Sequence, residues 1–174
     1  MPVDLKGYRV FIASPSGLDE ERNAFRVEIE EYNRCDSIAR NVQFIPVGWE
    51  ETLGGIRRPQ SKINDEVRKC DYFVMILYDR WGTPNGKDGD KKYSSGTEEE
   101  YNVAVGCFDD EEFPMRQIVI FFKSVDERRL SDPGKQLKKV LDFRKKLESQ
   151  KTHLFHVYDT VDSFAKWLRR YMAQ

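Results

Sequence analysis

Hydroxyl, guanidinium, aromatic and carboxylate side chains follow the apolar segments of this sequence, and they are the groups that a ribosyl phosphate site requires. Ser14 and Ser16 come directly after the first apolar segment, in a small polar loop before an amphipathic stretch. Such a loop exposes N–H groups at the positive end of a helix dipole, which favours an anion such as phosphate. Arg80 and Trp81 follow the third apolar segment.

A carboxylate joins this set at the start of a later amphipathic stretch, which contains Thr97, Glu100 and Tyr101. The spacing Thr97-x-x-Glu100 also fits a capping box, in which Thr97 accepts the N3 amide and Glu100 accepts the Thr97 amide. Residue types alone leave two roles open for Glu100, a helix cap and a side chain that faces a cleft. They also leave Trp81 as a buried anchor or a stacking platform, and Arg80 as a surface ion-pair partner of Asp79.

Short apolar runs alternate with longer amphipathic runs, which is typical of a parallel α/β domain. Strands are expected at 8–13, 42–49, 72–78, 117–122 and 154–158, and helices at 18–34, 61–70, 97–107, 136–147 and 161–171. The first helix should turn its apolar stripe to the core and its acids and Arg22 to solvent. The Pro-, Gly- and Asp-containing stretch 83–92 should form no packed element.

This alternation predicts a flavodoxin-like, doubly wound, five-stranded parallel sheet of order 2-1-3-4-5 with helices on both faces. Ligands of such sheets bind outside the carboxyl ends of the strands, at the switch point between strands 1 and 3. The topology therefore brings the polar loops after these strands to one crevice.

Composition and missing motifs exclude several function classes. Lys and Arg number 29 against 30 Asp and Glu, so direct nucleic-acid binding is not expected. Three scattered cysteines and two histidines predict reduced thiols and no metal site. The sequence contains no P-loop, no G-x-G-x-x-G after the first strand and no G-x-S-x-G elbow.

No apolar run approaches the roughly 20 residues of a membrane helix, and residues 1–6 do not resemble a secretory signal. We therefore expect a cytoplasmic protein without a membrane partner.

An ordered series of short motifs resembles the TIR-like domains that precede NACHT or STAND ATPase modules. The series begins with Val10-Phe11-Ile12-Ala13-Ser14 and continues at 48–50, 70–74, 80–82 and 95–101. The resemblance covers residues 8 to about 123 and implies one TIR-like domain over 1–174, excised from a larger multidomain protein or partnered by a separately encoded module. Ser95-Gly96-Thr97-x-x-Glu100 is more distantly similar to the helix-opening motif of nucleoside deoxyribosyltransferases.

These resemblances imply that Glu100 is the catalytic carboxylate of an NAD(P)+ nucleosidase, with NAD as substrate and no cofactor. Ser14, Ser16, Arg80, Trp81, Thr97 and Tyr101 would then bind the substrate. NAD-cleaving TIR enzymes usually carry a Trp one turn before the glutamate, where this sequence has Ser95-Gly96, so Tyr93, Tyr101 or Trp81 would replace it.

The resemblance further implies the effector of an immune-type, anti-phage sensor, activated by self-association or by a STAND or NACHT module. Two alternatives stay open: a non-enzymatic signalling or oligomerisation module, and a deoxyribosyltransferase-like N-glycosidase that acts on free nucleotides.

Overall fold

A computed structural model describes residues 2–48, 59–84, 87–88, 91–151 and 153–174. Its main sheet has five parallel strands in the order β2-β1-β3-β6-β7, which confirms the predicted order 2-1-3-4-5 and the flavodoxin-like fold. The strands are β1 Lys6–Ala13, β2 Val42–Val47, β3 Tyr72–Leu77, β6 Gln117–Lys123 and β7 Phe155–Tyr158.

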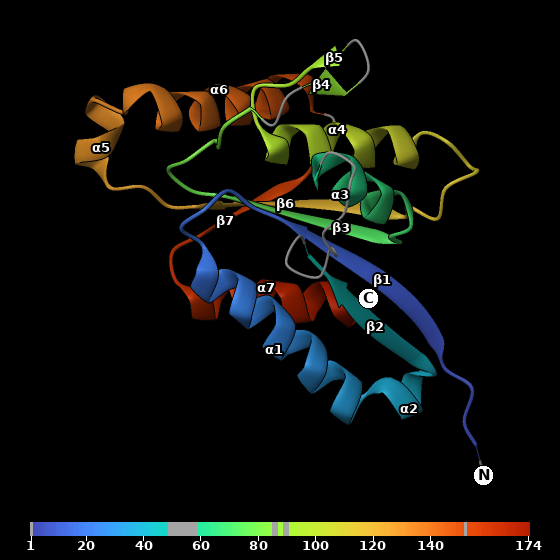
Figure 1. The fold of residues 1–174 in the computed structure, drawn as a ribbon. Helices are drawn as coiled ribbons and strands as arrows, with labels where there is room; N and C mark the ends of the chain where they lie inside the picture. Colours follow the sequence, from blue (N-terminus) through green and yellow to red (C-terminus); the bar gives the residue numbers. More distant parts are fainter. Residues whose placement is uncertain (1, 49–58, 85–86, 89–90, 152) are drawn as a thin grey trace.

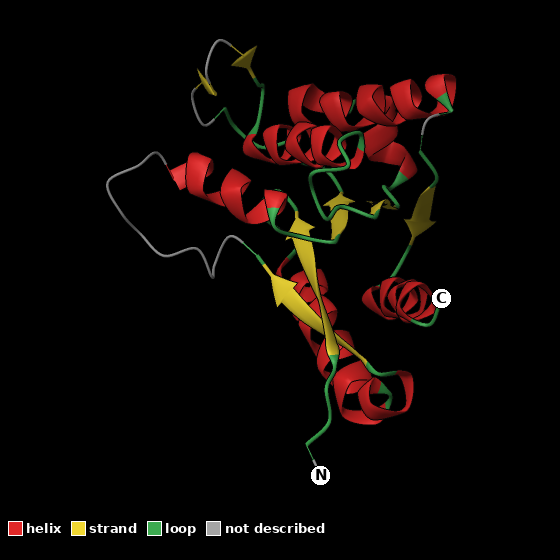
Figure 2. Cartoon of the chain, turned by 90° about the vertical axis from the view of Figure 1, so that its right-hand side faces the viewer, coloured by secondary structure: helices red, strands yellow, loops and turns green. Residues whose placement is uncertain are grey.

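The sheet lies between two helical layers (Figures 1 and 2). One layer contains α1 (Asp19–Cys35) and α7 (Val161–Met172), and the other contains α3 (Pro59–Arg68), α4 (Gly96–Phe108) and α6 (Gly134–Gln150). Two short helices, α2 (Ser37–Arg40) and α5 (Glu127–Ser131), were not expected from the sequence.

The central strands alternate their side chains between two apolar cores. Phe11 and Phe73 are fully buried in the core under α3, α4 and α6, with ring centroids 5.7 Å apart. Ile12 and Phe121 belong to the core under α1 and α7. Because β3 is covered on both faces, its sequence is a continuous apolar run, as parallel central strands require.

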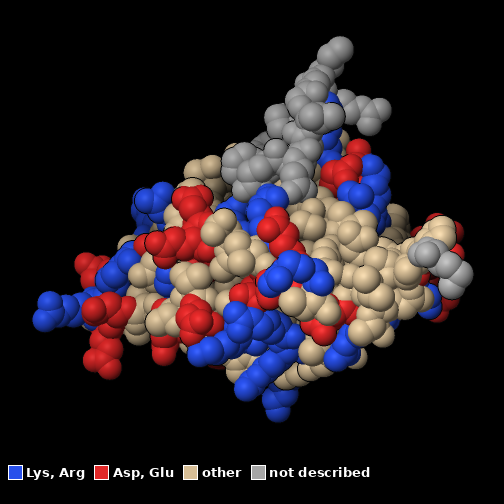
Figure 3. Space-filling view, turned by 90° about the horizontal axis from the view of Figure 1, so that it is seen from below, with Lys and Arg blue, Asp and Glu red and all other residues tan. Residues whose placement is uncertain are grey.

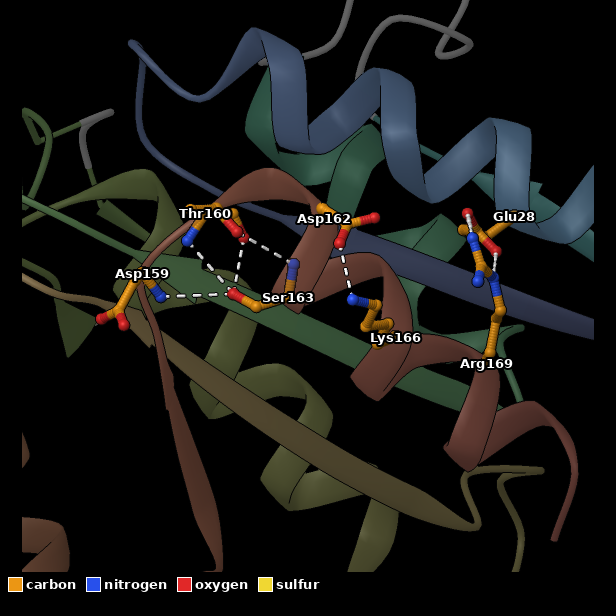
Figure 4. A network of polar contacts seen from close by, with 7 residues as sticks. All are labelled: Glu28, Asp159, Thr160, Asp162, Ser163, Lys166 and Arg169. Carbon is orange, nitrogen blue, oxygen red and sulfur yellow. Dashed lines mark hydrogen bonds and ion pairs between the residues drawn. The ribbon is translucent and has the colours of Figure 1, made fainter.

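The start of α7 and its contact with α1 are held by polar groups (Figure 4). Thr160 and Ser163 form a capping box, in which the Thr160 hydroxyl accepts from the Ser163 amide at 3.2 Å. Farther along α7, the Arg169 guanidinium donates to both carboxylate oxygens of Glu28 on α1. These contacts fix how the two helices cover the lower face of the sheet.

The expectation that α1 turns its acids and Arg22 to solvent is wrong for three residues. Glu21, Arg22 and Glu28 are all buried. Glu21 accepts from Lys123 Nζ at 2.7 Å and from the Tyr158 hydroxyl at 3.2 Å. Strand ends and α7 cover this side of α1 as well, so its charged side chains pair within the protein.

Two other expectations differ from the structure. Within 83–92, Lys87–Asp88 (β4) and Lys91–Lys92 (β5) pair as a short antiparallel ladder instead of staying irregular. α3 begins at Pro59, two residues before the expected cap Ser61. The end of the expected second strand, at residue 49, and the motif residue 50 lie outside the described residues.

The face seen from below in Figure 1 carries both signs of charge, with acidic and basic side chains near one another (Figure 3). Among the described residues, no helix combines the length and the apolar character needed to cross a bilayer.

Gly82 and Gly106 provide a matched test of how tightly the loop after β3 is built. Gly82 has φ +96°, and an added Cβ would lie 3.3 Å from the Ser95 Cβ, whereas Gly106 is exposed on α4 with open space around it. Gly82→Ala should lower the free energy of unfolding by about 1–2 kcal/mol. Gly106→Ala should raise it by about 0.5–1 kcal/mol because alanine favours a helix interior.

Urea denaturation of both variants measures the difference. Equal effects of the two substitutions would contradict a constrained loop at Gly82.

Candidate functional site

A pocket of about 840 Å³ opens at the carboxyl ends of β1 and β3, and α3, α4, α5 and the start of α6 complete its walls. This is the crevice at which the topology predicts a ligand. Its volume lies in the range of small-molecule and cofactor sites, roughly 300–1,000 Å³. The described lining residues are Ser14, Pro15, Ser16, Gln60, Ile63, Asp79, Arg80, Gly82, Thr83, Gly96, Thr97, Glu100, Arg129, Pro133, Gly134, Lys135, Gln136 and Leu137.

Five of the residues singled out from the sequence meet in this pocket. They come from the loop after β1, the loop after β3 and the first turns of α4, and they are Ser14, Ser16, Arg80, Thr97 and Glu100. The structure thus brings the hydroxyls, one guanidinium and the carboxylate to a common cavity.

Glu100 is only 7% exposed, yet it lines the pocket wall. Gln60 Nε2 on α3 donates to its Oε1 at 3.2 Å. Burial raises the pKa of Glu100 to about 7, an effect that the Gln60 hydrogen bond and the Arg22 charge oppose and the Glu99 charge reinforces. The carboxyl group therefore changes its charge near neutral pH.

Gln60 also belongs to a wider buried network that sequence reasoning missed. Its Nε2 lies 3.3 Å from Asn64 Oδ1, and Asn64 Nδ2 donates to Glu99 Oε1 at 2.8 Å. Gln60, Asn64 and Glu99 are each at most 2% exposed. The only signal in the sequence is the i, i+4 spacing of two amide residues on α3, which places both on one helix face.

The capping interpretation of Glu100 is wrong. The N-cap of α4 is Ser95, whose side chain accepts from the Glu98 amide at 3.1 Å. Glu98 in turn accepts from the Ser94 amide and the Ser94 hydroxyl, both at 2.6 Å. The cap expected at Thr97 is thus replaced by a Ser95 side-chain cap two residues earlier, and Glu100 is left on the pocket wall.

Arg22 connects the first loop to the carboxylate. Its Nη1 donates to the Ser14 hydroxyl at 2.7 Å, and its charge acts on Glu100 to lower the pKa of that carboxyl. The buried Arg22 guanidinium thus favours the ionised form of Glu100 and holds Ser14 in place. The sequence pattern assigned Arg22 to the solvent face and so missed this role.

Arg80 and Asp79 do not pair with each other, contrary to one expectation. Arg80 Nη1 donates to the Ser16 hydroxyl at 3.2 Å, which joins the loops after β3 and β1. Asp79 instead accepts from Arg129 Nη2 on α5 at 2.8 Å. Arg80 is exposed and lies on the pocket wall, where it can reach a ligand.

Trp81 and Tyr101 do not occupy the position that ring stacking on a ligand requires. The Trp81 indole is 4% exposed, packs against Phe143 and donates from Nε1 to the Ser94 hydroxyl at 2.7 Å. Tyr101 packs edge-on against Phe143 and against His153. Both side chains point into the α4–α6 contact because α6 covers this face of the sheet.

The described residues contain no cluster of three or more His, Cys, Asp and Glu side chains that could hold a metal ion. Cys70 and Cys107 are buried thiols, and burial raises the pKa of each, which disfavours the thiolate. His156 lies between the Trp167 ring and the Tyr171 hydroxyl, 2.6 Å from the latter.

Glu100→Gln tests the buried carboxyl through stability. A carboxyl pKa raised from 4.5 to about 7 favours the folded state fully below pH 4.5, and this contribution is lost as the pH rises through 7. Glutamine resembles the protonated form and does not titrate. The variant should therefore gain stability over the natural chain as the pH rises, by up to about 3 kcal/mol at pH 8.

Urea denaturation at pH 5 and pH 8 measures this, and the difference between the two proteins at each pH cancels the other titrating groups. A difference that is the same at both pH values would contradict the raised pKa.

Comparison with protein families matches residues 9–173 to a family described as a domain of unknown function, DUF4062. A search of curated proteins finds no match. The family match runs from β1 to the end of α7 and therefore includes every described residue of the pocket. The chain belongs to the DUF4062 family.

Proposed function

We propose that this domain cleaves the N-glycosidic bond of an NAD-type nucleotide, with Glu100 as the catalytic carboxylate. One observation carries the proposal: a glutamate that is more than nine-tenths buried lines a cavity large enough for a nucleotide, beside two serine hydroxyls and an arginine. A buried acid costs free energy, and a role in folding alone does not explain its place on a cavity wall.

The reaction would be hydrolysis of NAD+ to nicotinamide, ADP-ribose and a proton. The bond between the ribose C1′ and the ring nitrogen breaks, its electron pair goes to that nitrogen, and nicotinamide leaves as a neutral base. A water oxygen bonds to C1′ and releases the proton. Because the ring nitrogen is cationic before cleavage, no acid is needed to assist its departure.

What the site must supply is negative charge beside C1′, where an oxocarbenium-like centre develops. The ionised Glu100 carboxylate would provide it, by charge stabilisation or as a transient nucleophile that forms and then releases an ester at C1′. Gln60 would orient the carboxylate through its hydrogen bond to Oε1. Ser14, Ser16 and Arg80 would hold the ribose and its phosphate.

The resemblance to TIR-like domains supports the same assignment, because their NAD-cleaving members carry a glutamate at the start of the corresponding helix. It also supports activation by self-association within an immune-type sensor. The assay therefore needs the protein both as purified and at high concentration or fused to an oligomerising tag.

Glu100→Gln should lower nicotinamide release from NAD+ by at least a hundredfold, since it removes the only charge assigned to the reacting carbon. Glu112→Gln, an exposed glutamate after α4, is the matched control and should retain full activity. Chromatographic analysis of nicotinamide and ADP-ribose after incubation with NAD+ or NADP+ provides the measurement.

Release of a purine or pyrimidine from other nucleotides, with NAD+ untouched, would favour the N-glycosidase alternative. Absence of all turnover in the assembled protein, or equal turnover in Glu100→Gln, would favour a non-enzymatic module.

The pH dependence of kcat/KM offers a separate test, since only the ionised carboxylate carries the charge. The rate should rise with pH through about 7, the pKa of Glu100. Glu99→Gln removes a negative neighbour that raises this pKa, so the rise should move to lower pH. If Glu99→Gln does not shift the pH profile of kcat/KM, the titrating group is not Glu100.

A further inference from the structure

The pocket is electrostatically uneven. Its described lining contains three cations, Arg80, Arg129 and Lys135, against two acids, Asp79 and Glu100, although the whole chain has a net charge of −1. The cations come from the loop after β3, from α5 and from α6, whereas Glu100 extends from α4 beside α3. In Figure 1, α5 and the start of α6 lie to the left of α3, so two of the three cations belong to elements on the side away from α3.

The cationic side is held in place by one side chain. Gln136 Oε1 accepts from the Trp81 amide at 2.8 Å and from the Gly82 amide at 3.0 Å, while its Nε2 lies 3.3 Å from the Gly82 carbonyl oxygen. These contacts bind the start of α6 to the loop that contains Arg80. Arg80 and Lys135 are therefore positioned on one wall before any ligand arrives.

The first turn of α6 adds to this charge. α6 has 17 residues, its N-cap is Pro133, no side chain caps it, and its first turn contains no acid. Gly134, Lys135 and Gln136 at this end all line the pocket. The N–H groups of a first turn and the positive dipole end favour an anion. Nearby, Arg129 Nη2 lies 2.8 Å from Asp79 Oδ2. This ion pair reduces the repulsion that the Asp79 carboxylate would exert on a bound anion.

We propose that this wall, formed by Arg80, Lys135 and the first turn of α6, is a phosphate subsite, so that the substrate is a phosphorylated nucleoside and not a free nucleoside. The inference rests on the proposed function for the position of the sugar, which would lie beside Glu100. The phosphate or pyrophosphate attached to that sugar then extends toward α6. Lys135, an exposed residue in the first turn of α6, is the specificity-determining residue.

Binding measured without turnover tests the subsite. Isothermal titration of the Glu100→Gln protein at low salt uses inorganic pyrophosphate, ADP-ribose and adenosine as probes. Pyrophosphate and ADP-ribose should bind, and adenosine should bind at least tenfold more weakly than ADP-ribose because it lacks a charged group for this wall.

A further Lys135→Gln substitution should weaken pyrophosphate and ADP-ribose about tenfold, and Lys135→Arg should retain their affinity. Lys138→Gln is the matched control: it removes the same charge from an exposed position on α6 outside the pocket lining and should change affinity little. Lys135 and Lys138 are both exposed, so the lysine substitutions remove no core contact, and the Glu100→Gln background is the same in all the proteins compared.

Equal losses in Lys135→Gln and Lys138→Gln, adenosine affinity equal to that of ADP-ribose, or no binding of pyrophosphate would each overturn the subsite. The result is separable from the proposed reaction. Pyrophosphate binding that depends on Lys135, in a protein whose natural form cleaves no nucleotide, would support the subsite and refute the reaction. Cleavage of nucleosides as fast as nucleotides would support N-glycosidic chemistry and refute the subsite.

Discussion

The site depends on one constraint: the Glu100 carboxyl group must be almost fully buried and still line the pocket. Burial alone would leave it neutral, because desolvation disfavours the charged form. The Gln60 hydrogen bond and the Arg22 charge act in the opposite direction, and the balance lies near pH 7. The site therefore depends on side chains from both faces of the sheet: Arg22 from α1 on one face, and Gln60 from α3 and Glu100 from α4 on the other.

The parallel sheet makes that meeting possible. β1 and β3 are hydrogen-bonded neighbours, so the loops after them emerge side by side, and Arg80 can donate to Ser16 across 64 residues of sequence. Each loop also forms a hydrogen bond with a helix side chain. Arg22 on α1 donates to Ser14 in the loop after β1, and Gln136 on α6 accepts from the Gly82 amide in the loop after β3. A charge-stabilising site requires such preorganised groups.

Much of the fold could be predicted from the sequence, and less of the site. The apolar run of β3 and the alternation of strands with helices were sufficient to predict the strand order, because right-handed crossover connections allow few sheet topologies. The same order brought Ser14, Ser16, Arg80 and Glu100 to one crevice. Gln60 and Gln136 could not be predicted, since their partners lie 40 and 55 residues away along the sequence. Arg22 was missed because its place on an amphipathic helix indicated the solvent face, although its partner Ser14 is only eight residues away. Trp81 was ambiguous because burial by α6 depends on tertiary packing.

Under the proposed function, the two sides of the pocket match the two charges of an NAD-type substrate. The pyridinium would approach Glu100, and the pyrophosphate would approach Lys135 and the first turn of α6. A cation beside a carboxyl group lowers its pKa, so binding of the substrate would itself convert Glu100 to the ionised form that the reaction needs. When the neutral nicotinamide leaves, the positive charge passes to the sugar, and the carboxylate remains beside a cation throughout. A neutral nucleoside would provide neither the ionising charge nor the phosphate contact, so selection of the substrate and activation of the carboxylate would follow from the same uneven distribution of charge.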